Sequence, residues 1–136
     1  MNNYVGIIMG SKSDYKFAEN TMEVLKHYDI KFEVLIASAH RSPDRVKTYI
    51  KEAEEKGAKI FICLAGMAAH LAGAIAGLTT KPVIGVPLKG GAMDGLDAML
   101  STVQMPAGIP VATVALGSAG AKNSAHLAAQ MLSIND

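Results

Sequence analysis

Cysteine, tryptophan and long apolar runs are the scarce features of this sequence of 136 residues. It has no tryptophan and one cysteine, which excludes a disulfide framework and a metal site built from several cysteines. That residue, Cys63, lies within the apolar run "KIFICLAG" and is expected to be a buried small hydrophobe. No apolar run approaches the roughly 18–20 residues of a membrane span, and no N-terminal signal pattern is present. The sequence therefore predicts a cytoplasmic protein.

Strong charge is also missing. The formal net charge is +1 and no basic tract occurs, so neither nucleic acid nor a membrane surface is expected as a partner. Between Gly57 and Ala121 the only charged residues are Lys59, Lys81, Lys89, Asp94 and Asp97. A small domain with so few charges in its second half would expose large apolar patches if it stayed alone. We therefore expect a homo-oligomer.

Short apolar runs alternate with helical patterns along the whole chain, and half of the residues are hydrophobic. Strands are predicted over 4–9, 31–37, 59–65, 82–87 and 108–116, and helices over 13–28, 43–56, 67–78, 96–104 and 118–133. Strands that alternate with helices in this way indicate an α/β fold, here a flavodoxin-like domain over 1–136 with a five-stranded parallel sheet. In such folds ligands bind beyond the carboxyl ends of the strands.

The first loop at such a strand end is "MGSKSD", residues 9–14. Gly10 permits a tight turn, and the Ser11 and Ser13 hydroxyls lie beside the free N–H groups of a helix start, which suits a phosphate or a ribose. Asp14 could accept ribose hydroxyls. The alternative is a plain capping sequence, because Ser and Asp are common caps. The loop is neither a Walker loop nor a GxGxxG dinucleotide loop.

The second loop is "IASAHRSPDR", residues 36–45. Ser42 and Pro43 are explained as the N-cap and first residue of a helix. His40 and Arg41 have no such explanation. Arg41 could bind a phosphate through two hydrogen bonds, and His40 could move a proton near neutral pH. The alternative is an exposed pair in a surface loop.

Two further loops are rich in small residues. The first is "AGMAAHLAG" (65–73), which could bring backbone amides close to a ligand or allow tight helix packing. It contains His70, and a histidine in such apolar surroundings is more often a core residue than a catalyst. "LKGGAMDG" (88–95) suggests a ligand cover, with Met93, Met99 and Met105 as candidate lining. Neither metal-ligand spacing nor a GxSxG elbow occurs, so a metal enzyme or a serine hydrolase is not expected.

Five motifs in this order, "MGSKSD", "SAHR-P", "AG-AAHL-G", "GVP" and "VQMP-GIPV", resemble the AIR carboxylase family from about Val5 to Leu132. The class I members of that family act as mutases on N5-carboxyaminoimidazole ribonucleotide in purine biosynthesis. The resemblance implies a three-layer sandwich, assembly as an octamer, and a small-molecule ribonucleotide substrate. It also implies that no metal, ATP or organic cofactor is needed. The family commonly has a further C-terminal helix after the matching region.

The resemblance also assigns expected roles to residues. His40 matches the catalytic histidine and His70 a second active-site histidine. The expected substrate-binding residues are Ser11, Ser13, Asp14, Ser38, Ala39, Arg41, Ala65, Gly66 and Lys89. Among them, the residues that match the family's nucleotide-binding positions are Ser11, Asp14 and Arg41. The residues that match the small-residue walls around the reacting groups are Ser38, Ala39, Ala65 and Gly66. This chain departs from the family by having Met67 in place of a glycine and Ala72 in place of a proline.

Two alternatives stay open. A class II carboxylase, which adds free carbon dioxide to aminoimidazole ribonucleotide, typically has a lysine after the histidine of the second loop and lacks "AAHL". Arg41 and "AAHL" (68–71) therefore favour the mutase. A non-catalytic nucleotide-binding module would be supported by an acidic phospho-acceptor cluster at the strand ends, where only Asp14 is found.

Overall fold

Five parallel strands form one sheet in the order β2-β1-β3-β4-β5. The computed structural model describes residues 3–135. The strands are β1 (Tyr4–Met9), β2 (Phe32–Ile36), β3 (Ala58–Gly66), β4 (Val83–Leu88) and β5 (Ala112–Thr113). The helices are the short 3-10 helix η1 (Lys12–Asp14), α1 (Tyr15–His27), α2 (Pro43–Lys56), α3 (Leu71–Ala76), α4 (Leu96–Val103) and α5 (Gly117–Ser133). The predicted flavodoxin-like α/β fold with a five-stranded parallel sheet is confirmed.

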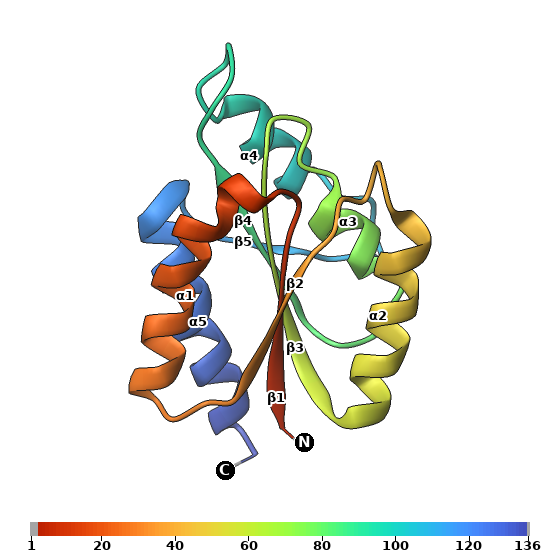
Figure 1. Cartoon of the computed structure of the whole chain (residues 1–136), viewed down its shortest axis with the longest axis vertical. Helices are drawn as coiled ribbons and strands as arrows, with labels where there is room; N and C mark the ends of the chain where they lie inside the picture. Colours follow the sequence, from red (N-terminus) through yellow and green to blue (C-terminus); the bar gives the residue numbers. More distant parts are fainter. Residues whose placement is uncertain (1–2, 136) are drawn as a thin grey trace.

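The sheet separates two hydrophobic cores. Because side chains alternate along a strand, Val5, Ile7 and Met9 pack toward α1 and α5, while Tyr4 and Ile8 pack toward α2 and α3. Figure 1 shows these two pairs of helices on opposite sides of the sheet, with α4 above them. The buried strands are apolar on both faces, as expected for a parallel sheet between two helical layers.

The first and last helices complete one of these cores together. The hydroxyl of Thr21 on α1 donates to the carbonyl of Ala121 on α5 over 2.9 Å, and both residues are fully buried. Ala121, Ala125 and Ala128 present only methyl groups to the core, which allows α5 to lie close to α1 and the sheet. One face of the sheet is thus covered by the two ends of the chain.

The strand register places the site loops at one height. Met9, the last residue of β1, pairs with Ile36 on β2 and with Leu64 on β3, and Gly66 pairs with Leu88 on β4. The carboxyl ends of four strands therefore lie at the same edge, where the loops after β1, β2, β3 and β4 can meet.

Two predicted elements were too long. The strand predicted over 108–116 is reduced to Ala112–Thr113, because Pro110 lacks an N–H group and Gly108, with φ 94°, bends the chain away from the sheet. The helix predicted over 67–78 is α3, Leu71–Ala76, because Met67 has φ 53° and leaves the helical region. Within residues 3–135, no helix is long and apolar enough to cross a membrane.

Gly85 on β4 packs closely against Thr102 of α4, and this contact gives the first prediction. A Cβ atom there would lie 2.4 Å from Cγ2 of Thr102 and 3.0 Å from Cγ1 of Val111. We expect Gly85→Ala to lower the free energy of unfolding by about 1–3 kcal/mol through overpacking, measured by urea denaturation. The matched control is Gly77→Ala at the end of α3, where φ is −75° and the nearest contact of a new Cβ is 3.6 Å. Equal stability of Gly85→Ala and the wild type would contradict this packing.

Candidate active site

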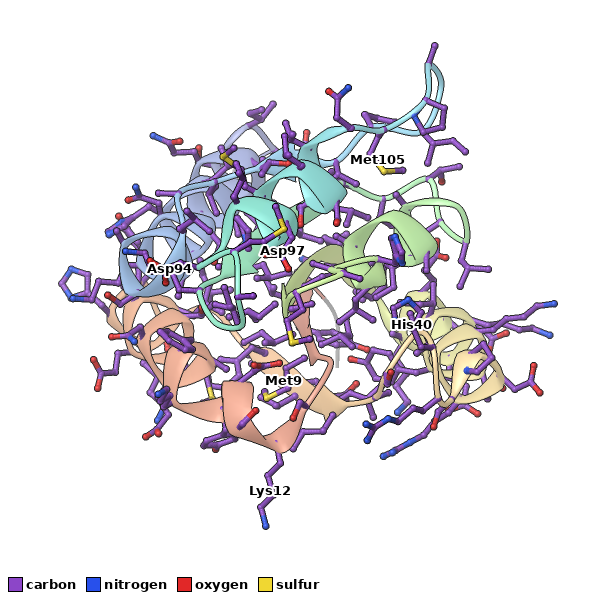
Figure 2. The ribbon with its side chains drawn as sticks, turned by 90° about the horizontal axis from the view of Figure 1, so that it is seen from above. Met9, Lys12, His40, Asp94, Asp97 and Met105 are labelled. Atoms are coloured by element: carbon purple, nitrogen blue, oxygen red, sulfur yellow. The ribbon has the colours of Figure 1, made fainter. Side chains whose placement is uncertain are left out.

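A cavity of about 730 Å³ opens at the carboxyl ends of the strands, in the size range of small-molecule sites. The loops after β1, β2, β3 and β4 all contribute to it. Every residue predicted to be catalytic or substrate-binding lines this cavity: Ser11, Ser13, Asp14, Ser38, Ala39, His40, Arg41, Ala65, Gly66, His70 and Lys89. Figure 2 looks down on this edge and shows Lys12 on the first loop and His40 on the loop before α2. Residues as far apart in sequence as Gly10 and Gly90 therefore surround one space.

The first loop is folded by its own serine hydroxyls. Ser11 Oγ accepts a hydrogen bond from the backbone N–H of Ser13 over 3.3 Å and lies 3.0 Å from Ser13 Oγ. Asp14 follows at the end of the turn and is half-buried. Burial raises the pKa of the Asp14 carboxyl above its ordinary value, and a hydrogen bond with the backbone of Ser11 lowers it only in part. A carboxylate at this depth can accept hydroxyl groups of a ligand.

The second loop is held by Ser38. Its Oγ accepts hydrogen bonds from the backbone N–H groups of His40 and Arg41, each over 3.2 Å, and its carbonyl accepts from the N–H of Ser42 over 2.9 Å. Ser42 occupies the N-cap position of α2 as predicted, but its side chain makes no capping hydrogen bond. Ser38, expected only as part of a small-residue wall, thus also fixes the direction of His40 and Arg41.

His40 and His70 contact each other across the cavity. Nε2 of His40 lies 2.8 Å from Nδ1 of His70, and the rings meet edge to face at 86° with centroids 5.0 Å apart. One of these nitrogens must carry the proton and the other must accept it. Nδ1 of His40 and Nε2 of His70 stay available for a ligand. Both histidines are exposed, so His70 is not the core residue that its apolar surroundings in the sequence suggested.

Positive charge dominates the cavity lining. Arg41, Arg45 and Lys89 are cations of this lining, against the single carboxylate of Asp14. Lys12 also lines the cavity, but its side chain points away from the domain (Figure 2). Such an arrangement favours an anionic ligand, and arginine suits a phosphate group in particular. Sequence reasoning missed Lys12 and Arg45. Arg45 stands four positions after Arg41, and that spacing across the start of a helix is the signal that could have found it.

The cover of the cavity differs from the prediction. Met93, Met99 and Met105 do not line it; Met105 instead packs on Gly73 of α3, with Sδ 3.0 Å from where a Cβ would stand. The methionine at the cavity is Met67. Ala72, the other departure from the family pattern, is buried in the core and does not reach the site.

Cys63 is also buried, as predicted, and burial raises the pKa of its thiol, which disfavours the reactive thiolate.

Comparisons with known proteins agree with this geometry. The family model "AIR carboxylase" matches residues 4–136. N5-carboxyaminoimidazole ribonucleotide mutase from Saccharolobus solfataricus is 51% identical over 130 residues, covering 96% of this chain and 81% of that protein. The protein of the same name from Pyrococcus horikoshii is 53% identical over 130 residues, covering 96% and 72%. Among solved structures, Treponema denticola PurE has a TM-score of 0.89 at 34% identity, covering 98% of this chain and 82% of that one.

The raised pKa of Asp14 gives a prediction about stability. A carboxyl whose pKa is higher in the folded than in the unfolded state makes folding less favourable wherever it is ionised. We expect Asp14→Asn to raise the melting temperature at about pH 7 by a few degrees at most, since the site is only half-buried. The gain should disappear as the pH falls through the unfolded-state pKa of about 3.9, because Asp14 is then protonated in both states.

Asp44→Asn provides the matched control for this comparison. Asp44 lies exposed in the first turn of α2, where a negative charge is favourable to the helix, so its removal should not raise the melting temperature. A lower melting temperature of Asp14→Asn than of the wild type at neutral pH would show that the buried carboxylate is stabilising.

Proposed function

Because the chain belongs to the AIR carboxylase family, we propose that it is an isomerase of de novo purine biosynthesis. It converts 5-(carboxyamino)imidazole ribonucleotide to 4-carboxy-5-aminoimidazole ribonucleotide. The observation that carries the proposal is the hydrogen-bonded pair of His40 and His70 at a cationic cavity with small-residue walls. A place in purine biosynthesis agrees with the cytoplasmic location predicted from the sequence.

The ribonucleotide is anionic, and the first two loops supply groups that suit it. Ser11 and Ser13 offer hydroxyls, while Arg41 and Arg45 offer guanidinium groups to the phosphate. Asp14 accepts the ribose hydroxyls as a carboxylate. These residues lie on the β1 and β2 side of the cavity, which leaves the imidazole to extend toward His40, His70 and the β3 loop.

A single proton donor and acceptor can serve both halves of the reaction. The bond between the carboxylate carbon and the exocyclic nitrogen breaks, which frees carbon dioxide, and the nitrogen receives a proton. Ring carbon 4 then attacks the carbon dioxide and becomes tetrahedral, carrying both a hydrogen and the new carboxylate. Loss of that hydrogen as a proton restores the aromatic ring. One proton is taken up and one returned, so His40 can give it and take it back.

His70 and the small-residue walls support this role for His40. The hydrogen bond to His70 holds the ring of His40 in one orientation and gives its proton an alternative site 2.8 Å away. Ala39, Ala65 and Gly66 leave room for the imidazole and the carbon dioxide beside the two rings. Exclusion of water from this space protects the freed carbon dioxide from hydration.

The reaction is tested by giving each substrate separately. Purified protein should convert 5-(carboxyamino)imidazole ribonucleotide without added bicarbonate, followed as the appearance of the carbon-carboxylated product. Conversion of aminoimidazole ribonucleotide only in the presence of carbon dioxide would replace the mutase with the class II carboxylase. Binding of the ribonucleotide without either reaction would indicate a non-catalytic module.

His40→Asn is expected to lose about 10²–10⁴-fold or more in kcat while it retains most of its affinity for the ribonucleotide, because only the proton carrier is removed. Single-turnover rates and equilibrium titration of the nucleotide measure the two effects. His126→Asn is the matched control, since His126 is an exposed histidine whose Nδ1 contacts Tyr28 on another part of the surface. Near-normal rates in His40→Asn would refute the assignment of the shuttle.

We further propose that the protein is a homo-oligomer, an octamer by the resemblance. Leu96, Leu100 and Val103 on α4 share one helix face at spacings of four and three, and each is 45–47% exposed. A single apolar face of this kind favours cover by another copy of the chain. No covering segment of the chain itself is found there within residues 3–135.

Light scattering after size-exclusion chromatography should give a mass of several chains, eight for the octamer. Leu100→Glu should shift the protein to smaller species, because it introduces a charge into the apolar face of α4. Thr48→Glu on the exposed side of α2 is a charge-matched control and should leave the mass unchanged. A wild-type protein that runs as a monomer at micromolar concentration would contradict the oligomer.

A further inference from the structure

Met67, in the loop between β3 and α3, combines three unusual properties. Its φ is 53°, in the left-handed region where a residue with a side chain pays an energetic cost that glycine does not. Its side chain is apolar yet 60% exposed. It also lines the cavity, directly after Gly66. A glycine would satisfy the backbone here, so the side chain itself calls for an explanation.

The side chain of Met67 reaches across to the glycine-rich loop 89–95. A Cβ atom on Gly91 would lie 3.3 Å from Cγ and 3.7 Å from Sδ of Met67, so the thioether rests against the bare backbone of Gly91. Lys89 and Gly90 of the same loop line the cavity. Met67 therefore contacts the loop that follows the neighbouring strand β4 and that also borders the site.

The loop 89–95 has little structure of its own to hold it in place. Gly90, Gly91 and Gly95 have φ of 147°, 72° and 97°, and Asp94 has φ 50°. No helix or strand includes these residues. A new Cβ on Gly90 would meet nothing within 4 Å, so the loop is open at Gly90. At its far end Gly95 is buried, and a Cβ there would lie 3.0 Å from Cδ2 of Leu116. The contact with Met67 is a point at which packing holds the loop.

We propose that Met67 is a positioning residue that holds the loop 89–95 at the mouth of the cavity and so retains carbon dioxide between the two halves of the reaction. The inference rests on the proposed mutase function. Carbon dioxide is small, neutral and apolar, and the cations around the cavity do not hold it as they hold a phosphate. A flexible thioether fills the gap between two loops without adding a polar group that would attract water.

The test follows the label in carboxylate-labelled 5-(carboxyamino)imidazole ribonucleotide in unlabelled bicarbonate buffer, after subtraction of the enzyme-free rate. The wild type should keep most of the label in the carbon-carboxylated product. Met67→Gly should release several-fold more label to the medium, together with aminoimidazole ribonucleotide. Its melting temperature should equal or exceed that of the wild type, because glycine relieves the left-handed backbone. A merely structural role would lower the melting temperature and leave label retention unchanged.

Two variants serve as controls. Met67→Leu keeps an apolar side chain of similar size and should retain label nearly as the wild type does. Met93→Ala removes another exposed methionine, one that belongs to the loop 89–95 but does not line the cavity, and should also retain label. Equal label retention in Met67→Gly and the wild type, with both isomerising, would overturn the inference. Failure of the wild type to isomerise would instead overturn the proposed function.

Discussion

The parallel register of β2, β1, β3 and β4 is the constraint on which the site depends. These strands end at one height, so four loops from different parts of the sequence border the same space. The hydrogen bond between His40 and His70 joins the loop after β2 to the loop after β3, although a third strand lies between these two. A slip of one residue in that register would turn every core side chain of a strand to the opposite face and move both histidines.

Two residues of the site lie in environments that are unfavourable for the folded protein. Partial burial of Asp14 disfavours the charged form of its carboxyl group, and Met67 has a left-handed backbone that is unfavourable for a residue with a side chain. Arg41, Arg45 and Lys89 gather nearby with one carboxylate among them. The mutual repulsion of these cations is costly in the empty protein and would be offset by an anionic ligand. The stability of the two hydrophobic cores offsets this cost.

The order of strands and helices could be read from the sequence because hydrophobic periodicity and helix caps are local signals. The helix predicted over 43–56, for example, is α2, and Gly57 directly after it ends the helix in the left-handed conformation with φ 106°. The bounds of β5 and α3 could not be read in this way, because they depend on whether a neighbouring strand pairs with Ala112–Thr113 and on the backbone of Met67. The residues predicted to be catalytic or substrate-binding came together because all of them lie at or after the carboxyl ends of strands of one sheet. The contact of His40 with His70, the hydrogen bonds of Ser38 and the approach of Met67 to Gly91 are tertiary, and no sequence pattern contains them.

The pairing of α1 with α5 has a consequence for how the protein is made. Val5, Ile7 and Met9 lie beside helix α1 early in synthesis, but the alanines that complete their core belong to residues 121–128 of a chain of 136. On the ribosome, one face of the sheet must therefore stay half-covered and apolar until residues 121–128 have emerged. The helices that cover the opposite face, α2 and α3, have both been synthesised once the chain reaches residue 76. The nascent chain is thus most exposed to aggregation on the α1 side until α5 has been synthesised.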